Sequence, residues 1–288
     1  MIPLPEPIAF ANDLTVYFEP GRTYALDELP PRSIALDGAV RGPAFDTATE
    51  RYSFDHHEGV IRHVTLATCE QVYDALRVGL DPRGFHVVLN DLDGDTVLSL
   101  WLLLHPEAVR GDGAARVEEL VRRFGRVDAL GPGWGEPHAV HAALTPSRKS
   151  KQSVSLLRGY LKIVDNWWSA GVVPRPPARE PARGFWFDAS GHVVHGEVAQ
   201  MTGLYEHASV GVLYDAAPHG TTAYTIAKRS EFVPYDVRAF LFAMNEREPG
   251  WGGGSTVGGA PRHPDGSRSR LTVEEVAAVF EAVAKKRG

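Results

Sequence analysis

Short apolar segments alternate with helical patterns in the first half of the chain. Four segments have the length and the apolar, β-branched or aromatic content of strands: Leu14–Phe18, Ser33–Leu36, Arg51–Phe54 and Phe85–Leu89. Apolar residues recur at helical spacing in four further stretches: Thr65–Val78, Thr96–His105, Ala114–Phe124 and Ser153–Trp168. Because strands alternate with helices, the pattern predicts an α/β fold with a mainly parallel sheet.

The pattern changes after a Pro-rich segment, residues 172–184, whose composition is typical of an extended spacer. Three predicted strands follow it: His192–Val198, Ser209–Tyr214 and Thr222–Lys228. Tyr235–Asn245 is a predicted helix, and a capping box at residues 272–275 begins a terminal one. The sequence therefore predicts two domains, residues 1–171 and a smaller α/β domain over residues 185–288.

Composition narrows the class of protein. A single cysteine, Cys69, excludes an intramolecular disulfide and a multi-cysteine zinc site. The net charge of −6 argues against a protein that coats long nucleic acid by bulk charge. The longest strongly apolar run, Val97–Leu104, is too short to cross a membrane, and the N-terminus lacks the pattern of a secretory signal. We therefore expect a cytoplasmic protein with no membrane partner.

Acidic and imidazole side chains follow three of the predicted strands. In chain order they are Asp37, the triplet Asp55-His56-His57, and the cluster Asp91, Asp93 and Asp95. Each group alone is explained by a turn or a helix cap. Their coincidence is informative because ligands of an open α/β sheet bind at the carboxyl ends of its strands.

Carboxylates and imidazoles without thiolates suit Mn²⁺, Mg²⁺ or Fe²⁺, and a mixture of His and Asp favours Mn²⁺. Crowded carboxylates repel one another unless cations neutralise them. Two ions about 3.5–4 Å apart can activate water for attack on phosphorus. The pattern therefore predicts a hydrolase with two metal ions.

Several motifs resemble those of the DHH phosphoesterase superfamily. FDHHEG at 54–59 resembles its signature motif, IALDG at 34–38 its single-Asp motif, and NDLDGDTVLSLWLL at 90–103 its Asp-x-Asp motif. Further along, AKRSEF at 227–232 and GWGGGSTVGGAPR at 250–262 resemble the DHH-associated C-terminal domain, which binds substrate. The resemblance implies a DHH-like metal-binding domain followed by this smaller domain.

The chain also departs from the family pattern. The Asp-x-Asp motif follows the triplet, whereas in the family it precedes it. Leu89 or Asn90 stands where the family has a His before that motif, and Ser255 stands where the glycine loop usually has a His. The resemblance therefore implies an altered motif order and a changed contact from the glycine loop.

The resemblance implies a role for each residue of the first domain. Asp37 would bridge the two ions, His56 would be a ligand, and Asp93 with Asp91 or Asp95 would complete the set. His57 would face the scissile phosphate, and Asp55 would fix the tautomer of an imidazole. A late acidic ligand is expected, for which Asp165 is the first choice and Asp128 the alternative.

In the second domain, Arg229 and Ser230 would contact the phosphate or sugar of the substrate. The loop formed by Gly252, Gly253, Gly254 and Ser255 would let backbone N–H groups approach an anion. Arg262 would pair with a phosphate. The alternative is that this glycine-rich stretch is simply a mobile loop.

We therefore predict a metal-dependent phosphoesterase that hydrolyses a nucleotide, a short oligonucleotide or a cyclic dinucleotide. The acidic charge favours a small phosphorylated substrate over processive nuclease action. Two alternatives stay open. One is a non-catalytic nucleotide-binding module. The other is an inorganic pyrophosphatase, because DGDTVLS at 93–99 also resembles a motif of that branch of the superfamily. The sequence also leaves open whether the protein forms a homodimer.

Overall fold

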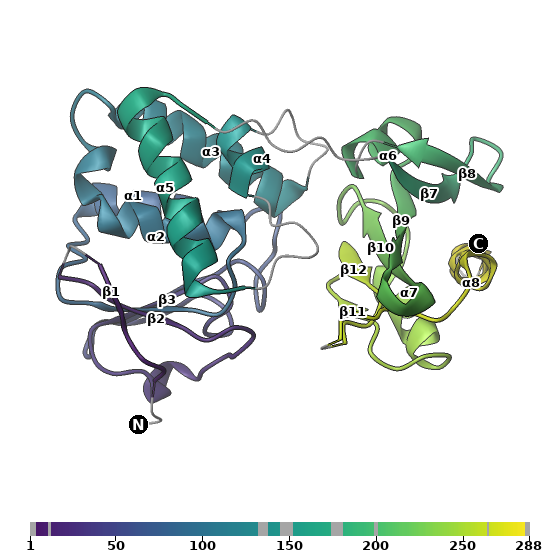
Figure 1. The fold of residues 1–288 in the computed structure, drawn as a ribbon, viewed down its shortest axis with the longest axis horizontal. Coiled ribbons are helices and arrows are strands. Elements are labelled where there is room, and N and C mark those ends of the chain that lie inside the picture. The colour runs from purple at the N-terminus through teal and green to yellow at the C-terminus, as the bar shows by residue number, and fades with distance from the viewer. Residues whose placement is uncertain are drawn as a thin grey trace. The chain divides into compact units, whose positions relative to one another are not determined.

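The computed structural model describes residues 4–10, 13–131, 138–144, 152–173, 181–198, 201–263 and 265–285. The chain divides into two compact units (Figure 1). The first comprises residues 1–130 and 134–176, and the second residues 131–133 and 177–288. The division falls within the predicted spacer, of which residues 174–180 lie outside the described part of the chain.

The first unit contains a six-stranded mixed sheet. Its strands are β1 (Ile8–Ala9), β2 (Thr15–Phe18), β3 (Ser33–Leu36), β4 (Ala44–Asp46), β5 (Arg51–Phe54) and β6 (His86–Leu89), in the order β1-β2-β6-β3-β5-β4. The four central strands are parallel, and β1 and β4 pair antiparallel at the two edges. The prediction of an α/β fold with a mainly parallel sheet is confirmed in its coarser form, a mixed α/β fold. The ends of β3 and β5 fall at the same edge of the sheet.

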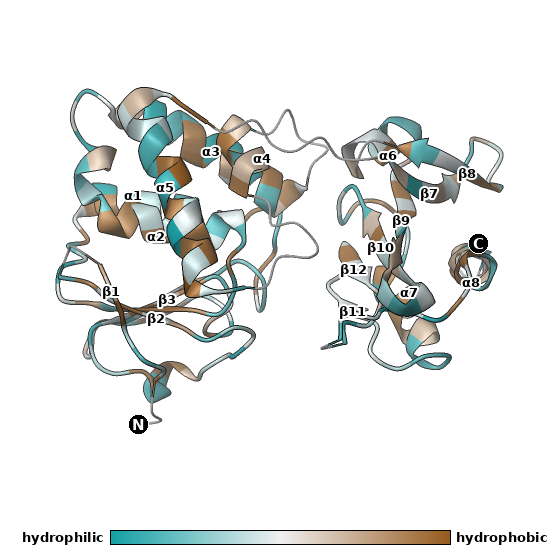
Figure 2. Cartoon of the chain, viewed as in Figure 1, coloured by the Kyte–Doolittle hydropathy of each residue, from teal (hydrophilic) through white to brown (hydrophobic). Residues whose placement is uncertain are grey.

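Five helices accompany this sheet in the described residues: α1 (Thr68–Val78), α2 (Gly94–Leu104), α3 (Ala114–Leu130), α4 (Ala139–Leu144) and α5 (Val154–Ala170). Short 3₁₀ turns lie at Leu26–Glu28 and Pro106–Val109. Every residue of α2 after Gly94 is buried, so this helix is enclosed on all sides. By contrast, α5 carries separate apolar and polar stripes (Figure 2).

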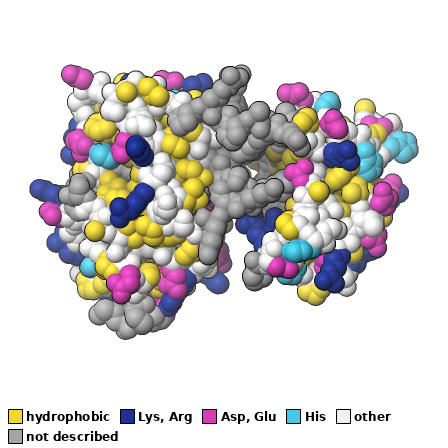
Figure 3. Space-filling model, in the orientation of Figure 1, with side chains coloured by type: hydrophobic (Ala, Val, Ile, Leu, Met, Phe, Trp, Pro, Cys, Tyr) yellow, Lys and Arg dark blue, Asp and Glu magenta, His cyan; other side chains and the backbone are white. Residues whose placement is uncertain are grey.

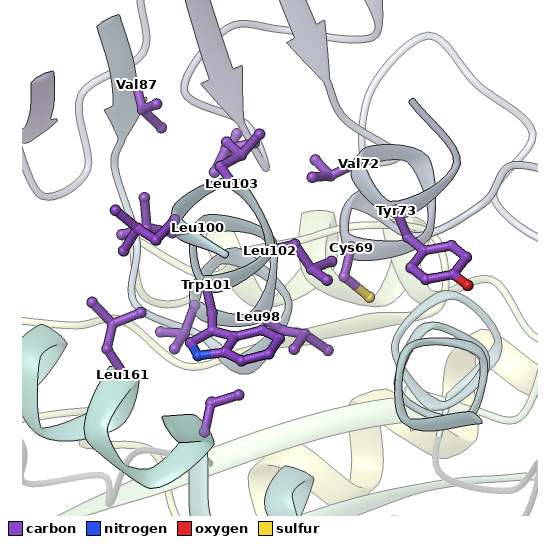
Figure 4. Close-up of a cluster of buried hydrophobic side chains, with 14 of the residues drawn as sticks. Cys69, Val72, Tyr73, Val87, Leu98, Leu100, Trp101, Leu102, Leu103 and Leu161 are labelled. Atoms are coloured by element: carbon purple, nitrogen blue, oxygen red, sulfur yellow. The ribbon is translucent and has the colours of Figure 1, made fainter. Parts of the chain in front are cut away.

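The core of the first unit centres on α2. Figure 4 shows its leucines and Trp101 beside Cys69, Val72 and Tyr73 of α1, with Leu161 of α5 nearby. The Cys69 thiol is buried in this cluster, and burial raises its pKa far above the usual value. Cys69 is therefore a core residue and no nucleophile.

The second unit contains a fully antiparallel sheet. Its strands are β7 (Ala182–Phe187), β8 (Val193–Val198), β9 (Val210–Ala217), β10 (Thr221–Lys228), β11 (Gly252–Gly253) and β12 (Val257–Gly259), in the order β11-β12-β10-β9-β7-β8. A 3₁₀ turn at Pro218–Gly220 joins β9 to β10. Alternate residues of the strands face two cores. One contains apolar residues of α7 (Val237–Asn245) and α8 (Val273–Lys285), and the other those of α6 (Met201–His207).

Several elements were not predicted from the sequence, among them β1, β4, α4, α6, β11 and β12. Two further differences are instructive. Strand β7 begins at Ala182, inside the predicted spacer, because the Pro-rich run before it hides the short apolar segment that follows. Helix α3 continues past Phe124 to Leu130 because Val127 continues the buried face that Val117, Leu120, Val121 and Phe124 form. The longer helix matters because it brings Asp128 into the first unit's acidic cluster.

Within the described residues, no helix combines the length and the apolar character that crossing a bilayer requires.

Candidate metal centre

Acidic and imidazole groups from four elements meet at one edge of the first sheet. Asp37 follows β3, and Asp55, His56 and His57 follow β5; these neighbouring parallel strands end side by side. Asp95 lies in the first turn of α2 and Asp128 in the last turns of α3. The fold therefore gathers groups that are far apart in the sequence.

His56 is the centre of this cluster. Its side chain is fully buried, and its Nε2 atom lies 2.8 Å from Asp128 Oδ2, 3.5 Å from Asp95 Oδ2 and 3.6 Å from Asp37 Oδ1. None of these contacts has the direction of a hydrogen bond, and neither ring nitrogen has a hydrogen-bond partner among the described residues. Because an unpartnered buried polar group is costly, this ring points to a ligand that satisfies it.

Asp37 is held by its backbone and by two hydroxyl groups. Its φ of 51° is in the left-handed region, which is uncommon for a residue other than glycine and is often found at functional sites. Thr68 Oγ1 donates to one carboxylate oxygen at 2.9 Å and Thr96 Oγ1 to the other at 3.1 Å. The carboxylate is therefore fixed beside both histidines.

Asp95 joins the starts of two helices. It lies in the first turn of α2, and its two oxygens accept hydrogen bonds from the Thr68 and Cys69 N–H groups of α1, both at 2.8 Å. Backbone donors at a helix N-terminus favour a carboxylate. Burial and repulsion from Asp128 nevertheless raise the pKa of Asp95 to about 7. Its Oδ2 atom still faces His56.

Burial, together with the crowding of carboxylates, raises the pKa of several of them. Burial, followed by repulsion from Asp93 and Asp95, raises the pKa of Asp37 well above its usual value. Burial and repulsion from Asp128 likewise raise the pKa of Asp93. A cation in this space would relieve the repulsion and allow all the carboxylates to ionise.

The geometry defines two overlapping groups of ligand atoms. One consists of Asp37, His56 and His57, the other of His56, Asp95 and Asp128, and the ligand atoms of each group lie within 4.8 Å of one another. Oxygen and imidazole donors without a thiolate fit a divalent cation such as Mn²⁺, Mg²⁺ or Fe²⁺. The buried Asp and His groups can thus hold a metal ion.

His57 has a different environment from His56. Its Nδ1 atom lies 2.9 Å from Asp55 Oδ1, which also accepts from the His57 backbone N–H, while Asp55 Oδ2 accepts from the Gly42 N–H. Burial raises the pKa of Asp55, but its bonds to His57 lower it more. Burial lowers the pKa of His57, but the bond to Asp55 raises it overall. Asp55 therefore holds a proton on Nδ1 of a ring that is partly open to solvent.

The structure separates the three aspartates at the start of α2. Asp95 joins the cluster, while Asp93 caps α2 by accepting from the Thr96 N–H at 2.8 Å. Asp91 accepts from the Leu92 N–H and from Gln152 Nε2, so its carboxylate is engaged elsewhere. Asp95 is therefore the member of this cluster that lies beside His56.

Asp165, the first choice for the late acidic ligand, lies outside the cluster. It belongs to α5, accepts from Trp101 Nε1 at 2.8 Å and lies 3.2 Å from His105 Nε2. The alternative, Asp128, lies beside His56.

Arg62 was not recognised in the sequence. One of its guanidinium nitrogens lies 3.1 Å from the Asp128 carbonyl oxygen and 3.4 Å from Asp128 Oδ2. This contact holds the end of α3 against the loop that follows the histidines. Arg62 lies in an irregular segment without periodicity, so the sequence offers no signal for it.

The predicted residues of the second unit make contacts within that unit. Arg229 donates to the Tyr205 carbonyl oxygen and lies over the Tyr205 ring. The Ser255 hydroxyl is hydrogen-bonded to Glu231, and the Ser230 carbonyl accepts from the Val233 N–H in a turn. Arg262 is exposed.

The glycine-rich stretch forms a tight hairpin. Gly252 and Gly253 pair with Gly259 and Gly258, and the Gly254 N–H donates to the Val257 carbonyl oxygen. Gly253 has a φ of 145°, and a Cβ atom there would lie 2.3 Å from Gly258 Cα. Close approach of two strands explains at least this glycine without a bound anion.

Comparisons with models of protein families, with curated proteins and with solved structures find no match to this chain. Its function is therefore inferred from the chemistry of the cluster and from the motifs in its sequence.

Proposed function

We propose that the chain is a metal-dependent phosphoesterase whose first unit binds divalent cations, with Mn²⁺ as the preferred ion. The observation that supports this function is the fully buried His56 ring. Its Nε2 atom lies 2.8–3.6 Å from carboxylate oxygens of Asp37, Asp95 and Asp128, in directions that do not suit hydrogen bonds. A purely structural histidine would have its nitrogens hydrogen-bonded.

The ligand assignment is based on the two overlapping groups, with His57 kept for proton transfer rather than for metal binding. His56, Asp95 and Asp128 would hold one ion, and Asp37, which faces both histidines, would contribute to a second. Asp93 lies close enough to raise the pKa of Asp37, so it is available to the same charge cluster. When bound, divalent ions supply a nucleophile at neutral pH and neutralise charge that develops on phosphoryl oxygens.

His57 and Asp55 supply the proton chemistry. Because Asp55 accepts from Nδ1, the other ring nitrogen of His57 is left for the substrate, and the bond to Asp55 raises the pKa of the ring. A protonated ring can donate to a phosphoryl oxygen or to the leaving oxygen. Asp55 is a positioning residue, because it fixes the tautomer and the orientation of His57.

We propose a phosphoester of a nucleotide, a short oligonucleotide or a cyclic dinucleotide as the substrate. The net charge of −6 supports a short substrate over a long polyanion. On the face shown in Figure 3, acidic side chains are interspersed with the basic ones. We also propose that the protein is cytoplasmic and that Arg262 contributes to phosphate binding.

The test is hydrolysis of bis(p-nitrophenyl) phosphate by the purified protein. We expect turnover with Mn²⁺, none with EDTA, and none in His56→Ala, because that variant lacks the central ligand. His105→Ala is the matched control, since His105 pairs with Asp165 away from the cluster. Wild-type activity in His56→Ala would contradict the assignment.

A panel of substrates separates the alternatives. Nucleotide binding by calorimetry without turnover under any metal would favour a non-catalytic module. Hydrolysis of pyrophosphate but of no organic phosphoester would favour an inorganic pyrophosphatase.

A further inference from the structure

A pocket of about 590 Å³ opens on the first unit, lined by the loop before α1 and by the facing sides of α1 and α3. Its volume lies in the range of roughly 300–1,000 Å³ that is usual for small-molecule sites. The residues that we assign to the metal centre do not line it.

The pocket wall combines apolar and cationic side chains. Val64, Leu66, Ala129 and Leu130 form its apolar part, and the Val64 side chain is exposed. Arg122 and Arg126 lie four residues apart on one face of α3, with Arg123 beside them. Such a wall fits a ligand that has an apolar ring system and a negative charge.

The arginines differ in how far their charge is already neutralised. Arg122 lies 2.6 Å from Asp74 Oδ1 and 3.4 Å from Glu70 Oε1, so its charge is committed to these two carboxylates. Arg123 lies 3.5 Å from Glu119. Arg126 is exposed and has no ion pair with any residue in the described part of the chain. Among the described residues, Arg126 is therefore the arginine of this pocket whose charge is not paired with a carboxylate.

Two residues that line the pocket are chain neighbours of residues at the candidate metal centre. His63 lines the pocket and follows Arg62, whose guanidinium contacts Asp128. Ala129 lines the pocket and follows Asp128 itself. The pocket and the candidate metal centre are thus linked through two chain segments, residues 62–63 and 128–129.

We infer that this pocket binds a nucleoside and a second phosphate of a dinucleotide or short oligonucleotide whose scissile phosphate lies at the metal centre. The inference rests on the proposed phosphoesterase function and narrows its substrate class. The nucleobase would pack on Leu66 and Leu130, and the second phosphate would pair with Arg126. Pyrophosphate has no group for the apolar wall, and a nucleoside monophosphate has no second phosphate.

The experiment compares Arg126→Gln and Val64→Glu with matched controls. Glutamine retains helix propensity without the charge, and a glutamate at exposed position 64 would repel an anion. Arg83→Gln removes an exposed arginine elsewhere, and Val78→Glu places the same charge at an exposed valine outside the pocket. The probes are the 5′-phosphorylated dinucleotide pApA and bis(p-nitrophenyl) phosphate, which carries no second phosphate.

With Mn²⁺, we expect both pocket variants to raise the KM for pApA about tenfold, equivalent to about 1.4 kcal/mol. Their kcat/KM for bis(p-nitrophenyl) phosphate should equal that of the wild type, and both controls should match the wild type on both substrates. Unchanged kinetics of both pocket variants on pApA would overturn the inference. An equal loss on both substrates would also overturn it, since it would show a general effect on the metal centre.

Equilibrium binding of pApA in EDTA separates this inference from the proposed function. Binding that Arg126→Gln weakens about tenfold, in a protein without any turnover, would support the pocket and refute the phosphoesterase. Turnover of bis(p-nitrophenyl) phosphate together with pApA binding that is insensitive to Arg126→Gln would support the phosphoesterase and refute the pocket. Inorganic phosphate that binds in EDTA as tightly as pApA would overturn recognition of the nucleoside.

Discussion

At the candidate metal centre, burial changes the ionisation and the hydrogen bonding of single side chains. Asp37 and Asp95 lie in a position where repulsion and desolvation oppose their ionised forms, yet hydroxyl and backbone donors hold both carboxylates in place. His56 adds a buried ring without a hydrogen-bond partner. A divalent cation would satisfy all three, so we expect Mn²⁺ to stabilise the folded protein in addition to its role in the proposed hydrolysis.

Asp128 and Asp165 provide a direct test of the late acidic ligand. We expect Asp128→Asn to weaken Mn²⁺ binding and to lower kcat/KM by about 100-fold or more, since losses of 10–100-fold are typical even for residues behind the ligands. Asp165→Asn is the control and should bind Mn²⁺ like the wild type. Calorimetry with Mn²⁺ and the phosphodiesterase assay check both values. A larger loss of Mn²⁺ binding and kcat/KM in Asp165→Asn than in Asp128→Asn would instead identify Asp165 as the ligand.

Asp37→Asn separates stability from metal binding. Asparagine tolerates a left-handed φ and can still bond to Thr68 and Thr96, so we expect the metal-free variant to melt at or above the wild-type temperature. Mn²⁺ at about 100 times its Kd should stabilise the wild type by about 2.7 kcal/mol and the variant by much less. Thermal melts with and without Mn²⁺ measure this. An equal gain in both proteins would remove Asp37 from the site.

At the level of elements, the contact between α2 and α3 positions the cluster. A Cβ atom at Gly94 would lie 2.4 Å from Phe124 Cζ, so only glycine permits this approach of α3 to the start of α2. Asp128 lies one helical turn after Phe124. The small side chain at the start of α2 thus allows α3 to bring Asp128 beside His56.

Gly94→Ala is therefore expected to affect both stability and metal binding. Overpacking against Phe124 should destabilise the first unit by about 1–3 kcal/mol and should weaken Mn²⁺ binding by displacing Asp128. Gly159→Ala is the matched control, because a Cβ atom there meets no atom within 4 Å; it should stabilise α5 by about 0.4–1 kcal/mol. Urea denaturation and Mn²⁺ titration check both variants, and wild-type Mn²⁺ affinity in Gly94→Ala would contradict this role.

At the level of the whole molecule, the buried side chains form separate cores. Two of the clusters belong to the first unit and two to the second. Each unit thus has the apolar core that a domain needs to fold. The metal centre draws all its side chains from the first unit.

We expect calorimetry of the full chain to show two unfolding transitions, of which Mn²⁺ raises only one. The reason is that a ligand stabilises the cooperative unit to which it binds. His56→Ala should abolish the shift while both transitions remain. A single transition that Mn²⁺ shifts as a whole would show that the two units unfold together.

The sequence alone determined most of the elements of this protein and the set of chemical groups at its strand ends. Local periodicity predicted β3, β5 and β6 close to their final bounds, because a short buried strand is specified by its own apolar residues. The placement of Asp37 and His56 followed from the rule that parallel strands end at one edge. Strand β7 was missed where the spacer-like composition masked it.

Only the tertiary structure decided which carboxylates face the histidine. Asp91, Asp93 and Asp95 are close in sequence, yet the turn into α2 directs Asp95 to His56, Asp93 to a helix cap and Asp91 to Gln152. Asp128 and Asp165 both lie on helices, and the packing of Phe124 on Gly94 distinguishes them. Such choices depend on contacts between distant segments, and neither local propensity nor hydrophobic period encodes them.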